Sequence, residues 1–344
     1  MSIGKITTGF IGSAWISLML LSSQANAQEE LINFFEAGKE DGSKLVTAYI
    51  NPFVSGFSYA LNGGWFHTAK PHKLGGFDIN IAITPTFIPS SEDYFKPNEL
   101  GLTRTRLVTP TDGRAPTVIG PKVGTTYELD ADGNGTYELS IDGPKGLDLR
   151  EELRIAPAGS PMIQIGIGLV KSTDLMIRFT PRIDLGNGDF KMLGFGVRHD
   201  IKQHIPGIKM LPFDLSLMAG YTNIEINVDM SGAFPSNTTA PQEMTVKFNA
   251  FLLEALISKK LAFATFFGGI GYNGINTNAD IKGNYVFSQG VSAELNDPYS
   301  GSFKNNSMRL DAGLRLNLLA FYIYGNYSIQ KYNALTVGLG FTFR

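Results

Sequence analysis

Cysteine is absent from this sequence of 344 residues. Its absence excludes disulfide bonds, thiolate metal sites, a cysteine nucleophile and a lipid anchor on an N-terminal cysteine. An excess of positive charge is absent too, because 29 lysines and arginines stand against 31 acidic residues, for a net charge of -2. Nucleic-acid binding normally needs a clustered basic surface. We therefore expect no nucleic-acid partner.

Long apolar runs are missing after residue 27, where no segment reaches the roughly 20 residues that a membrane-spanning helix needs. Such a chain can cross a bilayer only as a closed barrel, in which every backbone N–H and C=O is paired. Before residue 27, Lys5 precedes an apolar run over residues 6–21, and the small-residue pattern Ala25-Asn26-Ala27 follows. This layout predicts a signal peptide over residues 1–27, cleaved near Ala27, and hence export.

Apolar residues alternate with polar or small ones in stretch after stretch. They take every second position in LTVGLGFTFR, at residues 335–344, and in most of MRLDAGLRLNL, at residues 308–318. Alternation of this kind is typical of strands with one apolar face. About ten such stretches predict an all-β fold, a transmembrane antiparallel β-barrel of about 10–14 strands over residues 74–344. Residues 245–256 and 263–272 alternate less cleanly, which indicates a β-bulge.

The strands of a soluble β-sandwich would also alternate apolar and polar residues. The composition of the non-apolar face therefore has to distinguish a sandwich from a barrel. That face mixes Gly and Thr with Arg, Asp and Asn, as expected of a narrow lumen, while the apolar face is continuous. The connections favour a barrel too, because short and long links alternate along the chain. The longest excursion, residues 90–159, would be extracellular, and the link at residues 199–212 would form an amphipathic turn at the inner membrane boundary.

The segment before the barrel, residues 28–73, is different in kind. Leu31, Phe35, Leu45 and Tyr49 have helical spacing, and the pattern predicts a helix that stops at Asn51-Pro52. The Gly-rich, aromatic stretch that follows is too irregular for a clear strand. It either plugs the barrel or adds a strand to it.

No motif indicates catalysis, a metal or a cofactor. The histidines form two pairs, His67 with His72 and His199 with His204, and a spacing of five fits neither a helical nor a strand metal pair. DADGNGTYELSID, from Asp130, resembles a calcium loop but has Ile141 where the bidentate Glu belongs. GIGYNG has no helix after it, so it does not predict a dinucleotide site. We expect no enzyme activity, no metal and no cofactor.

Several charged side chains would point from the polar face into one narrow lumen. Buried charges need partners. They could form a structural network that fills a closed barrel, joined by plug acids such as Glu36, Glu40 or Asp41. They could equally form a cationic lining that attracts anionic head groups. The candidate lumen residues are Arg178, Arg182, Arg198, Asp214, Lys247, Arg309, Asp311 and Arg315.

The final strand, whose Phe343 is followed by Arg344, resembles the C-terminal signal read by the machinery that assembles barrels in the outer membrane. With the N-terminal helix and hairpins such as SPMIQIGIGLVKSTDLMIRFTP, the chain resembles a family of uncharacterised Gram-negative outer-membrane barrels. More distantly, it resembles the FadL-type transporters of hydrophobic compounds, in which an N-terminal hatch plugs the lumen. The resemblance implies residence in the outer membrane, with outer-membrane lipid and the barrel-assembly machinery as partners.

Three functions follow as hypotheses. The first is a porin-like, passive channel or transporter for small hydrophobic or amphipathic molecules, gated by the plug. The second is a closed structural barrel that displays extracellular loops for binding or assembly. The third, and least favoured, is an outer-membrane lipid hydrolase that uses His67 or His199.

Overall fold

The computed structural model describes residues 31–150, 157–158, 161–184, 186–232, 234–287 and 290–343. The signal peptide predicted for residues 1–27 lies outside these described residues. Within them, no helix combines the length and the apolar character needed to cross a bilayer.

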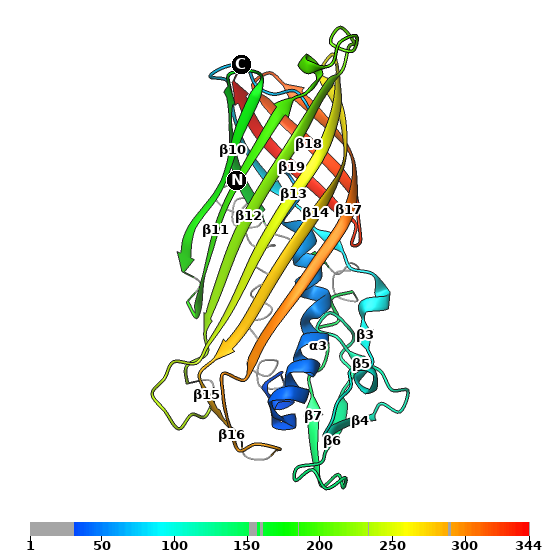
Figure 1. The fold of residues 1–344 in the computed structure, drawn as a ribbon, viewed down its shortest axis with the longest axis vertical. Coiled ribbons are helices and arrows are strands. Elements are labelled where there is room, and N and C mark those ends of the chain that lie inside the picture. Colours follow the sequence, from blue (N-terminus) through cyan, green and yellow to red (C-terminus); the bar gives the residue numbers. More distant parts are fainter. Residues whose placement is uncertain are drawn as a thin grey trace, which may run out of the picture.

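Ten antiparallel strands and one N-terminal helix form the fold, which confirms the predicted class (Figure 1). Each barrel strand pairs with the next one along the chain, and the first strand closes the ring by pairing with the last, from Phe77↔Phe343 to Ile83↔Val337. In order around the barrel the strands are β1 (Phe77–Ile83), β9 (Pro161–Leu169), β10 (Thr173–Asp184), β11 (Gly188–Asp200), β12 (Asp214–Asp229), β13 (Glu243–Leu261), β14 (Ala264–Lys282), β17 (Tyr299–Leu318), β18 (Phe321–Ile329) and β19 (Ala334–Phe343).

The barrel wall is uneven in height. Strand β17 has 20 residues, whereas its neighbour β18 has 9. All strands share one end of the barrel, where the C-terminus lies, and we call it the inner end (Figure 1). At the other end, the outer end, β12, β13, β14 and β17 continue past the short strands. The outer end therefore has a tall wall on one side only.

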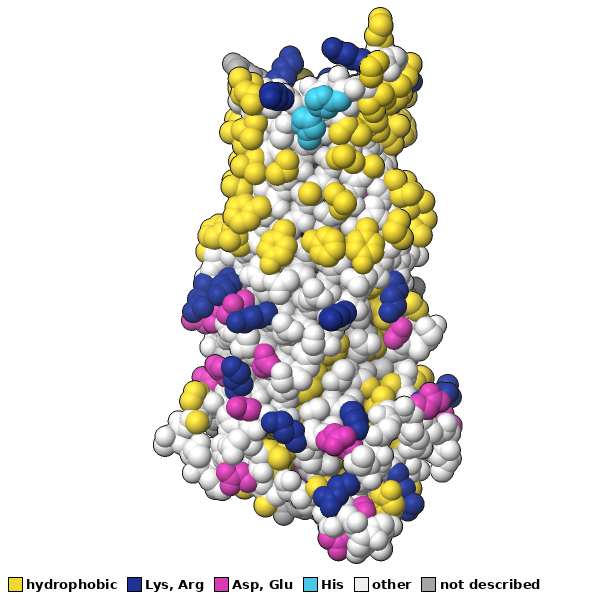
Figure 2. Space-filling model, viewed as in Figure 1, with side chains coloured by type: hydrophobic (Ala, Val, Ile, Leu, Met, Phe, Trp, Pro, Cys, Tyr) yellow, Lys and Arg dark blue, Asp and Glu magenta, His cyan; other side chains and the backbone are white. Residues whose placement is uncertain are grey.

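The outward face changes character along each long strand. On β17, Met308 and Leu318 lie at the two ends of an exposed apolar row, while Lys304 and Asn306 continue the same face toward the outer end. The apolar row covers ten residue steps, about 25 Å of height at about 3.3 Å per residue and about 40° of tilt. This height matches the apolar band of a membrane barrel. Exposed apolar side chains accordingly gather on the inner half in Figure 2, and acidic ones on the outer half.

The inward face changes in the opposite sense. On β17, Arg309, Asp311 and Arg315 face the lumen at the level of the apolar band, whereas Tyr299 and Phe303 are buried farther out. Strand β12 likewise replaces inward Ser216 and Thr222 by Ile224, Ile226 and Val228. The long strands thus have an apolar outside in the band and an apolar inside beyond it. The outer half is consequently built like a water-soluble protein.

Aromatic side chains mark the border between the two halves. Phe195, Tyr221 and Phe251 are paired with one another across β11, β12 and β13, and all three are exposed. Tyrosine and other aromatic residues are typical of the girdle at a membrane–water interface.

The apolar interior of the outer half is covered by the N-terminal segment. The 3-10 helix η1 (Phe34–Ala37) and helix α3 (Gly38–Ala60) pack against the long strands, and Phe57 of α3 lies 4.8 Å from Phe248 of β13 between ring centroids. A small sheet of β4 (Thr105–Thr109), β6 (Thr125–Leu129) and β7 (Leu139–Gly143) covers the other side. We call these elements, with the outer parts of the long strands, the outer module. The remaining short elements are β2 (Thr86–Phe87), η2 (Ser90–Glu92), β3 (Tyr94–Phe95), η3 (Pro97–Glu99), β5 (Ala115–Pro116), β8 (Pro157–Ala158), η4 (Lys202–His204), β15 (Asn284–Val286) and β16 (Glu294–Asn296).

Two local predictions are wrong. Helix α3 does not stop at Asn51-Pro52 but continues to Ala60, because burial of its C-terminal half among the strands outweighs the hydrogen bond that a proline removes. Residues 245–256 and 263–272 contain no bulge, since the β13–β14 ladder keeps its register from Glu243↔Lys282 to Leu261↔Ala264. In residues 245–256 the irregular pattern arises from the change of face described above. In residues 263–272 it arises from glycines on both faces and from the inward Phe267.

The connections follow the predicted rule in part. Three inner links are short, residues 170–172, 262–263 and 319–320, and the fourth, residues 201–213, is the predicted exception. Its Met210 is 94% exposed and adjoins the apolar band, as expected of an interfacial turn. Three outer links are long, residues 84–160, 230–242 and 283–298, but those at 185–187 and 330–333 are short.

Candidate functional site

The lumen at the level of the apolar band is occupied by the chain between α3 and β1. Residues 61–69 of this stretch are almost wholly buried, and we call residues 61–73 the plug. Its main chain is bound by side chains of several barrel strands. Asn62 donates to the carbonyl of Phe251 at 3.0 Å, and the N–H of Ala69 donates to Ser258 Oγ at 2.9 Å.

Four barrel arginines bind the plug. Arg178 donates to the carbonyls of Leu61 and Gly63 at 3.0 and 2.6 Å, and Arg309 donates to that of Asn62 at 2.8 Å. Toward the inner end, Arg198 donates to the carbonyl of Thr68 at 2.6 Å. The fourth, Arg315, donates to His67 Nδ1 at 2.8 Å. Charge-assisted bonds of this kind are about twice as strong as neutral ones.

His67 links the plug to β1 and β18. Its Nε2 donates to Asp78 Oδ2 at 2.9 Å, and Tyr322 donates to the same oxygen at 2.7 Å. Because Arg315 donates to Nδ1, that nitrogen must carry a lone pair, so the imidazole is neutral in this arrangement. Arg315 in turn lies 3.9 Å over the ring of Tyr322. A second proton on His67 would break the contact with Arg315.

A second ionic layer lies nearer the inner end. Asp174 forms an ion pair with Arg198 and accepts from the backbone N–H of His72 at 2.9 Å, with His72 Nδ1 at 3.2 Å from its other oxygen. His67 thus binds Asp78, whereas His72 binds Asp174 and lies 3.8 Å from Asp78. Each of them fixes the plug to the wall.

A third layer surrounds Arg309. Its guanidinium makes two bonds to Asp311, of 2.6 and 2.8 Å, and one to Ser328 Oγ at 2.9 Å. Glu254 of β13 is buried next to this pair and interacts electrostatically with both groups. Removing one member of such a buried set leaves an uncompensated charge and costs about 3–5 kcal/mol.

Trp65 fills a niche between strands β11 and β12. A Cβ at Gly196 would lie 2.7 Å from the indole, and one at Gly220 would lie 2.8 Å from it, so neither position accommodates a larger residue without displacement. The Arg178 guanidinium also lies over the indole, 3.6 Å from the ring centroid. Two glycines in neighbouring strands thus admit the largest side chain of the plug.

The structure places the predicted lumen residues in three different locations. Arg178, Arg198, Arg309, Asp311 and Arg315 lie in the lumen and contact the plug or one another. Asp214 is half-buried at the inner mouth, on the face of Ser216.

Arg182 and Lys247 do not line the lumen, which corrects the prediction. Arg182 lies 3.4 Å from Asp189 with its side chain 62% exposed, because the register shifts between Thr180 and Ile183 and reverses the face. Lys247 shares the outward face of Phe251, beyond the apolar band, and lies 3.8 Å from Glu225.

Asp41 and Glu40 of the N-terminal segment are paired with groups other than the lumen arginines. Asp41 is buried in the outer module, where it accepts from the backbone N–H groups of Thr103 and Arg104 at 3.0 and 2.8 Å. Glu40 forms a 2.8 Å ion pair with Lys44 at the surface. Glu36 is buried in η1, about one turn before the start of α3.

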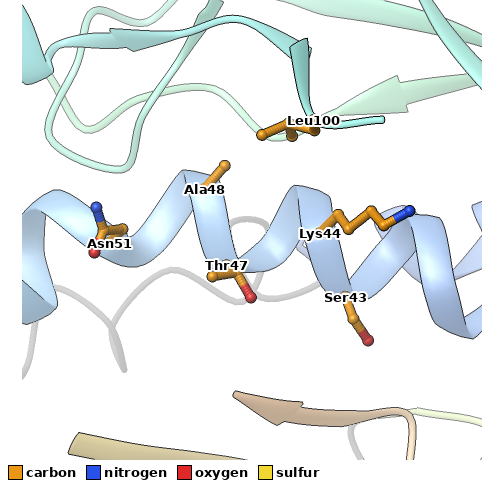
Figure 3. Close-up of a pocket in the computed structure, with 6 residues that line it drawn as sticks. All are labelled: Ser43, Lys44, Thr47, Ala48, Asn51 and Leu100. Carbon is orange, nitrogen blue, oxygen red and sulfur yellow. The ribbon is translucent and has the colours of Figure 1, made fainter. Parts of the chain in front are cut away.

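A groove of about 490 Å³ opens along α3, facing the segment that contains η3 (Figure 3). Lys44 binds the carbonyl of Gly101 at 2.7 Å and Glu40 at 2.8 Å, so its charge is already partnered. The remaining polar groups are neutral hydroxyls and an amide. The groove is lined by Ser43, Lys44, Thr47, Ala48, Asn51 and Leu100.

The calcium-like loop is folded around one carboxylate. Asp130 accepts from the N–H groups of Gly133, Asn134 and Gly135 at 2.7, 3.0 and 2.9 Å. Its partial burial raises the pKa of this carboxyl, but these three N–H groups lower it more, so that the pKa lies below its ordinary value. Asp132 and Glu138 lie nearby, but the oxygens of Asp130 are engaged with the backbone.

Several residues of the site escaped the sequence analysis. Trp65, Asp78, Gln164 and Glu254 carry no local motif, and their partners are distant in sequence. Gln164 and Glu254 do, however, interrupt the small or apolar residues around them on the lumen face of their strands, whereas Asp78 is followed on that face by Asn80. A single polar residue within a small or apolar lumen face could have indicated a residue that binds the plug or a lumen charge.

Taken together, the apolar band, the closed ladder and the occupied lumen define a plugged β-barrel of the outer-membrane type. The chain belongs to a family of unknown function (DUF6588), whose model matches residues 5–343. No curated protein matches the chain in sequence.

Solved structures similar to the chain include two autotransporter barrels and an adhesin-like barrel. The translocator domain of the autotransporter NalP from Neisseria meningitidis has 12% identity and a TM-score of 0.35, and the match covers 88% of this chain and 98% of that one. The transport unit of the autotransporter AIDA-I from Escherichia coli has 8% identity and a TM-score of 0.33, covering 86% and 97%. The attachment invasion locus protein Ail of Yersinia pestis has 10% identity and a TM-score of 0.26, covering 78% and 99%. These three add no support for the FadL-type resemblance.

Proposed function

We propose that the protein is a closed barrel in the outer membrane of a Gram-negative bacterium, and that it displays the outer module at the cell surface for binding. The observation that carries this proposal is the plug, which four barrel arginines bind inside a narrow lumen, three through its main chain and one through the side chain of His67. Barrels of eight strands have an interior that side chains fill, and a ten-stranded one has little more room. We assign the protein no catalytic role.

The outer module supplies the surface for binding in this proposal. Its wall, helix and small sheet form a core of their own, and the groove along α3 opens on it (Figure 3). Neutral hydroxyl and amide groups beside Ala48 and Leu100 suit a small polar or amphipathic ligand. The partners of the barrel itself would be outer-membrane lipid at the apolar band and the assembly machinery at β19.

A second candidate is passive transport of small hydrophobic or amphipathic molecules, with the plug as gate. It is favoured by incomplete satisfaction of buried polar atoms at the plug. Asn62 Oδ1, Trp65 Nε1 and Arg198 Nε are buried and have no hydrogen-bond partner among the described residues. Unpaired groups of this kind cost about 1–3 kcal/mol each and favour a state in which the plug moves.

Single-channel recording in planar lipid bilayers separates the two candidates. The closed barrel predicts no conductance from the chain that begins at Gln28. The variants Gly196→Ala and Gly220→Ala, which disturb Trp65, are recorded beside it. The gated channel predicts openings that the variants make more frequent. Frequent openings of the unaltered chain would refute the closed barrel.

A further inference from the structure

A row of amide side chains crosses the outward face of the long strands just beyond the aromatic border. Asn223 of β12 is paired with Asn249 of β13, Asn249 with Asn276 of β14, and Asn276 with Lys304 of β17. Neighbouring strands lie about 4.8 Å apart, so the three amides stand side by side. We call Asn223, Asn249 and Asn276 the amide row. Figure 2 shows a zone without charged side chains between the apolar inner half and the charged outer half.

Part of the amide row is held in place by neighbouring side chains. Asn223 donates to Asn249 Oδ1 at 3.0 Å, and the hydroxyl of Tyr221 donates to the same oxygen at 2.8 Å. The NH₂ group of Asn249 makes no hydrogen bond to any other residue that the structure describes. A donor whose orientation is fixed before binding costs less to immobilise than a mobile one.

The rest of this face carries free amides. Asn276, Asn278 and Asn306 are exposed, and their side chains make no hydrogen bond within the described part of the chain. Asn278 follows Asn276 on this face toward the outer end, and Asn306 follows Lys304 toward the inner end. Each amide has two N–H donors and a carbonyl acceptor. The face therefore presents a grid of neutral donors and acceptors.

Apolar side chains continue the same face toward the band. Phe251 lies across Gly274, where a Cβ would be 2.3 Å from its ring, and the Tyr272 ring lies 5.8 Å from that of Phe251 between centroids. The next row, Leu253, Tyr272 and Met308, is exposed at the level of the apolar band. A molecule bound to the amides therefore adjoins hydrocarbon on one side. That position suits the head group of a lipid whose acyl chains lie along the barrel wall.

Charge distinguishes a sugar head group from a phosphate head group. Glu225, in the row beyond the amides, lies 3.0 Å from Lys191 and 3.8 Å from Lys247, so these two ammonium groups already have a partner. Among the described residues, the amide row adjoins a single unpaired cation, Lys304. Several cations together favour phosphate, whereas sugar hydroxyls donate and accept as amides do. The chemistry of this face favours a saccharide.

We propose that the amide row, together with Asn278, Asn306 and Lys304, binds the saccharide head group of a glycolipid in the outer leaflet of the membrane. The sugar hydroxyls bind the amides, the aromatic border lies against the sugar, and the acyl chains lie along the apolar band. This inference rests on the outer-membrane residence proposed above and deepens it by naming the lipid class. It does not depend on the binding role of the outer module.

Energy transfer from Trp65 to a dansyl-labelled lipid tests the proposal. Trp65 is the single tryptophan of the chain from Gln28 and lies against Gly220, next to Tyr221. The chain is inserted into phosphatidylcholine vesicles that contain a small fraction of dansyl-labelled rough-type lipopolysaccharide, a glycolipid with core sugars. Transfer should exceed that to dansyl-labelled phosphatidylglycerol at the same fraction, because the glycolipid is enriched at the barrel wall.

Loss of the amides should remove this enrichment. Asn276→Ala and Asn278→Ala should each weaken glycolipid association about two- to tenfold, the range for one hydrogen bond. The triple variant that adds Asn249→Ala should reduce transfer to the phosphatidylglycerol level. Asn98→Ala removes an exposed amide from η3, away from this face, and is the matched control that should behave like the unaltered chain. The emission maximum of Trp65 checks that each variant is folded.

Two results would overturn the proposal. They are equal transfer to the glycolipid and to phosphatidylglycerol in the unaltered chain, and unchanged transfer in the triple variant. Core oligosaccharide without acyl chains should compete far more weakly than unlabelled lipopolysaccharide, and equal competition would refute the assignment to a membrane lipid. Flotation of the chain with the vesicles measures insertion separately. Failure to insert would refute the proposed membrane residence and this inference with it, whereas insertion without enrichment would refute this inference alone.

Discussion

Adding one methyl group at Gly196 or Gly220 should displace the plug. The new Cβ would lie 2.7 or 2.8 Å from the indole of Trp65, about 1 Å closer than carbon atoms normally approach. The Arg178 guanidinium lies over the same ring at 3.6 Å, which limits where the indole can move. Overpacking in such a place costs about 1–3 kcal/mol. The equilibrium between seated and displaced plug should therefore shift by roughly 5- to 150-fold toward the displaced state.

Tryptophan fluorescence reports this shift directly. The sequence contains two tryptophans, Trp15 and Trp65, so the chain that begins at Gln28 has Trp65 alone. Trp65 is 1% exposed, and its emission should be blue-shifted and insensitive to iodide in the unaltered protein. Gly196→Ala and Gly220→Ala should move the emission to longer wavelength and increase quenching by iodide.

Gly325→Ala is the matched control. Gly325 lies in strand β18, and a Cβ there would meet its nearest neighbour at 4.0 Å, an ordinary contact. This variant should leave emission and quenching unchanged. The packing argument for Trp65 is wrong if the Gly196 and Gly220 variants behave like the Gly325 variant.

Three further predictions concern the band and the outer module. Leu253→Arg, at a lipid-facing position of β13, should lower the free energy of unfolding in vesicles by about 2–4 kcal/mol, whereas Thr245→Arg on the same face beyond the band should change it by less than about 1 kcal/mol; equal effects would contradict the assigned border. Asp41→Ala should cost about 1–3 kcal/mol for each backbone N–H left unpaired and make residues 97–104 exchange amide hydrogens faster, while Glu40→Ala, which removes a surface ion pair, should cost less than about 1 kcal/mol; a larger loss for Glu40 would refute this. The depressed pKa of Asp130 means that its contribution to stability is present above the carboxyl's unfolded pKa and is lost as the pH falls through the folded value. The amide protection factors of residues 130–138 should therefore fall in acid, and the Asp130→Asn variant should lack this pH dependence; an identical acid response in that variant would exclude the mechanism.

The barrel was predictable because the two faces of each strand lie in different environments. Hydrocarbon outside and a narrow lumen inside force a period of two, which is visible in residues 308–318 without any knowledge of the partner strands. The same rule predicts the wrong face for Lys247. Water replaces lipid outside that part of the strand, so the outward face becomes the polar one although the strand geometry stays the same. A local pattern does not record how far a strand extends beyond the bilayer.

The occupied lumen was predictable only in outline. Arginines on the lumen face predict buried partners. The partner of Arg315, however, is His67, which lies 248 positions away in the sequence. Helix α3 continues through Pro52 because of burial by strands that come later in the chain. Local propensity cannot foresee either contact. The niche of Trp65 likewise requires two strands to be correctly aligned before it exists.

The uneven wall has a consequence for biogenesis. The outer parts of β12, β13, β14 and β17 expose hydrophobic inner surfaces until η1 and α3 arrive, and these come from the opposite terminus of the polypeptide. The pairing of β1 with β19 also joins the first and the last strand of the barrel. An incompletely assembled molecule would thus expose apolar surface to chaperones and proteases, whereas the completed fold buries it.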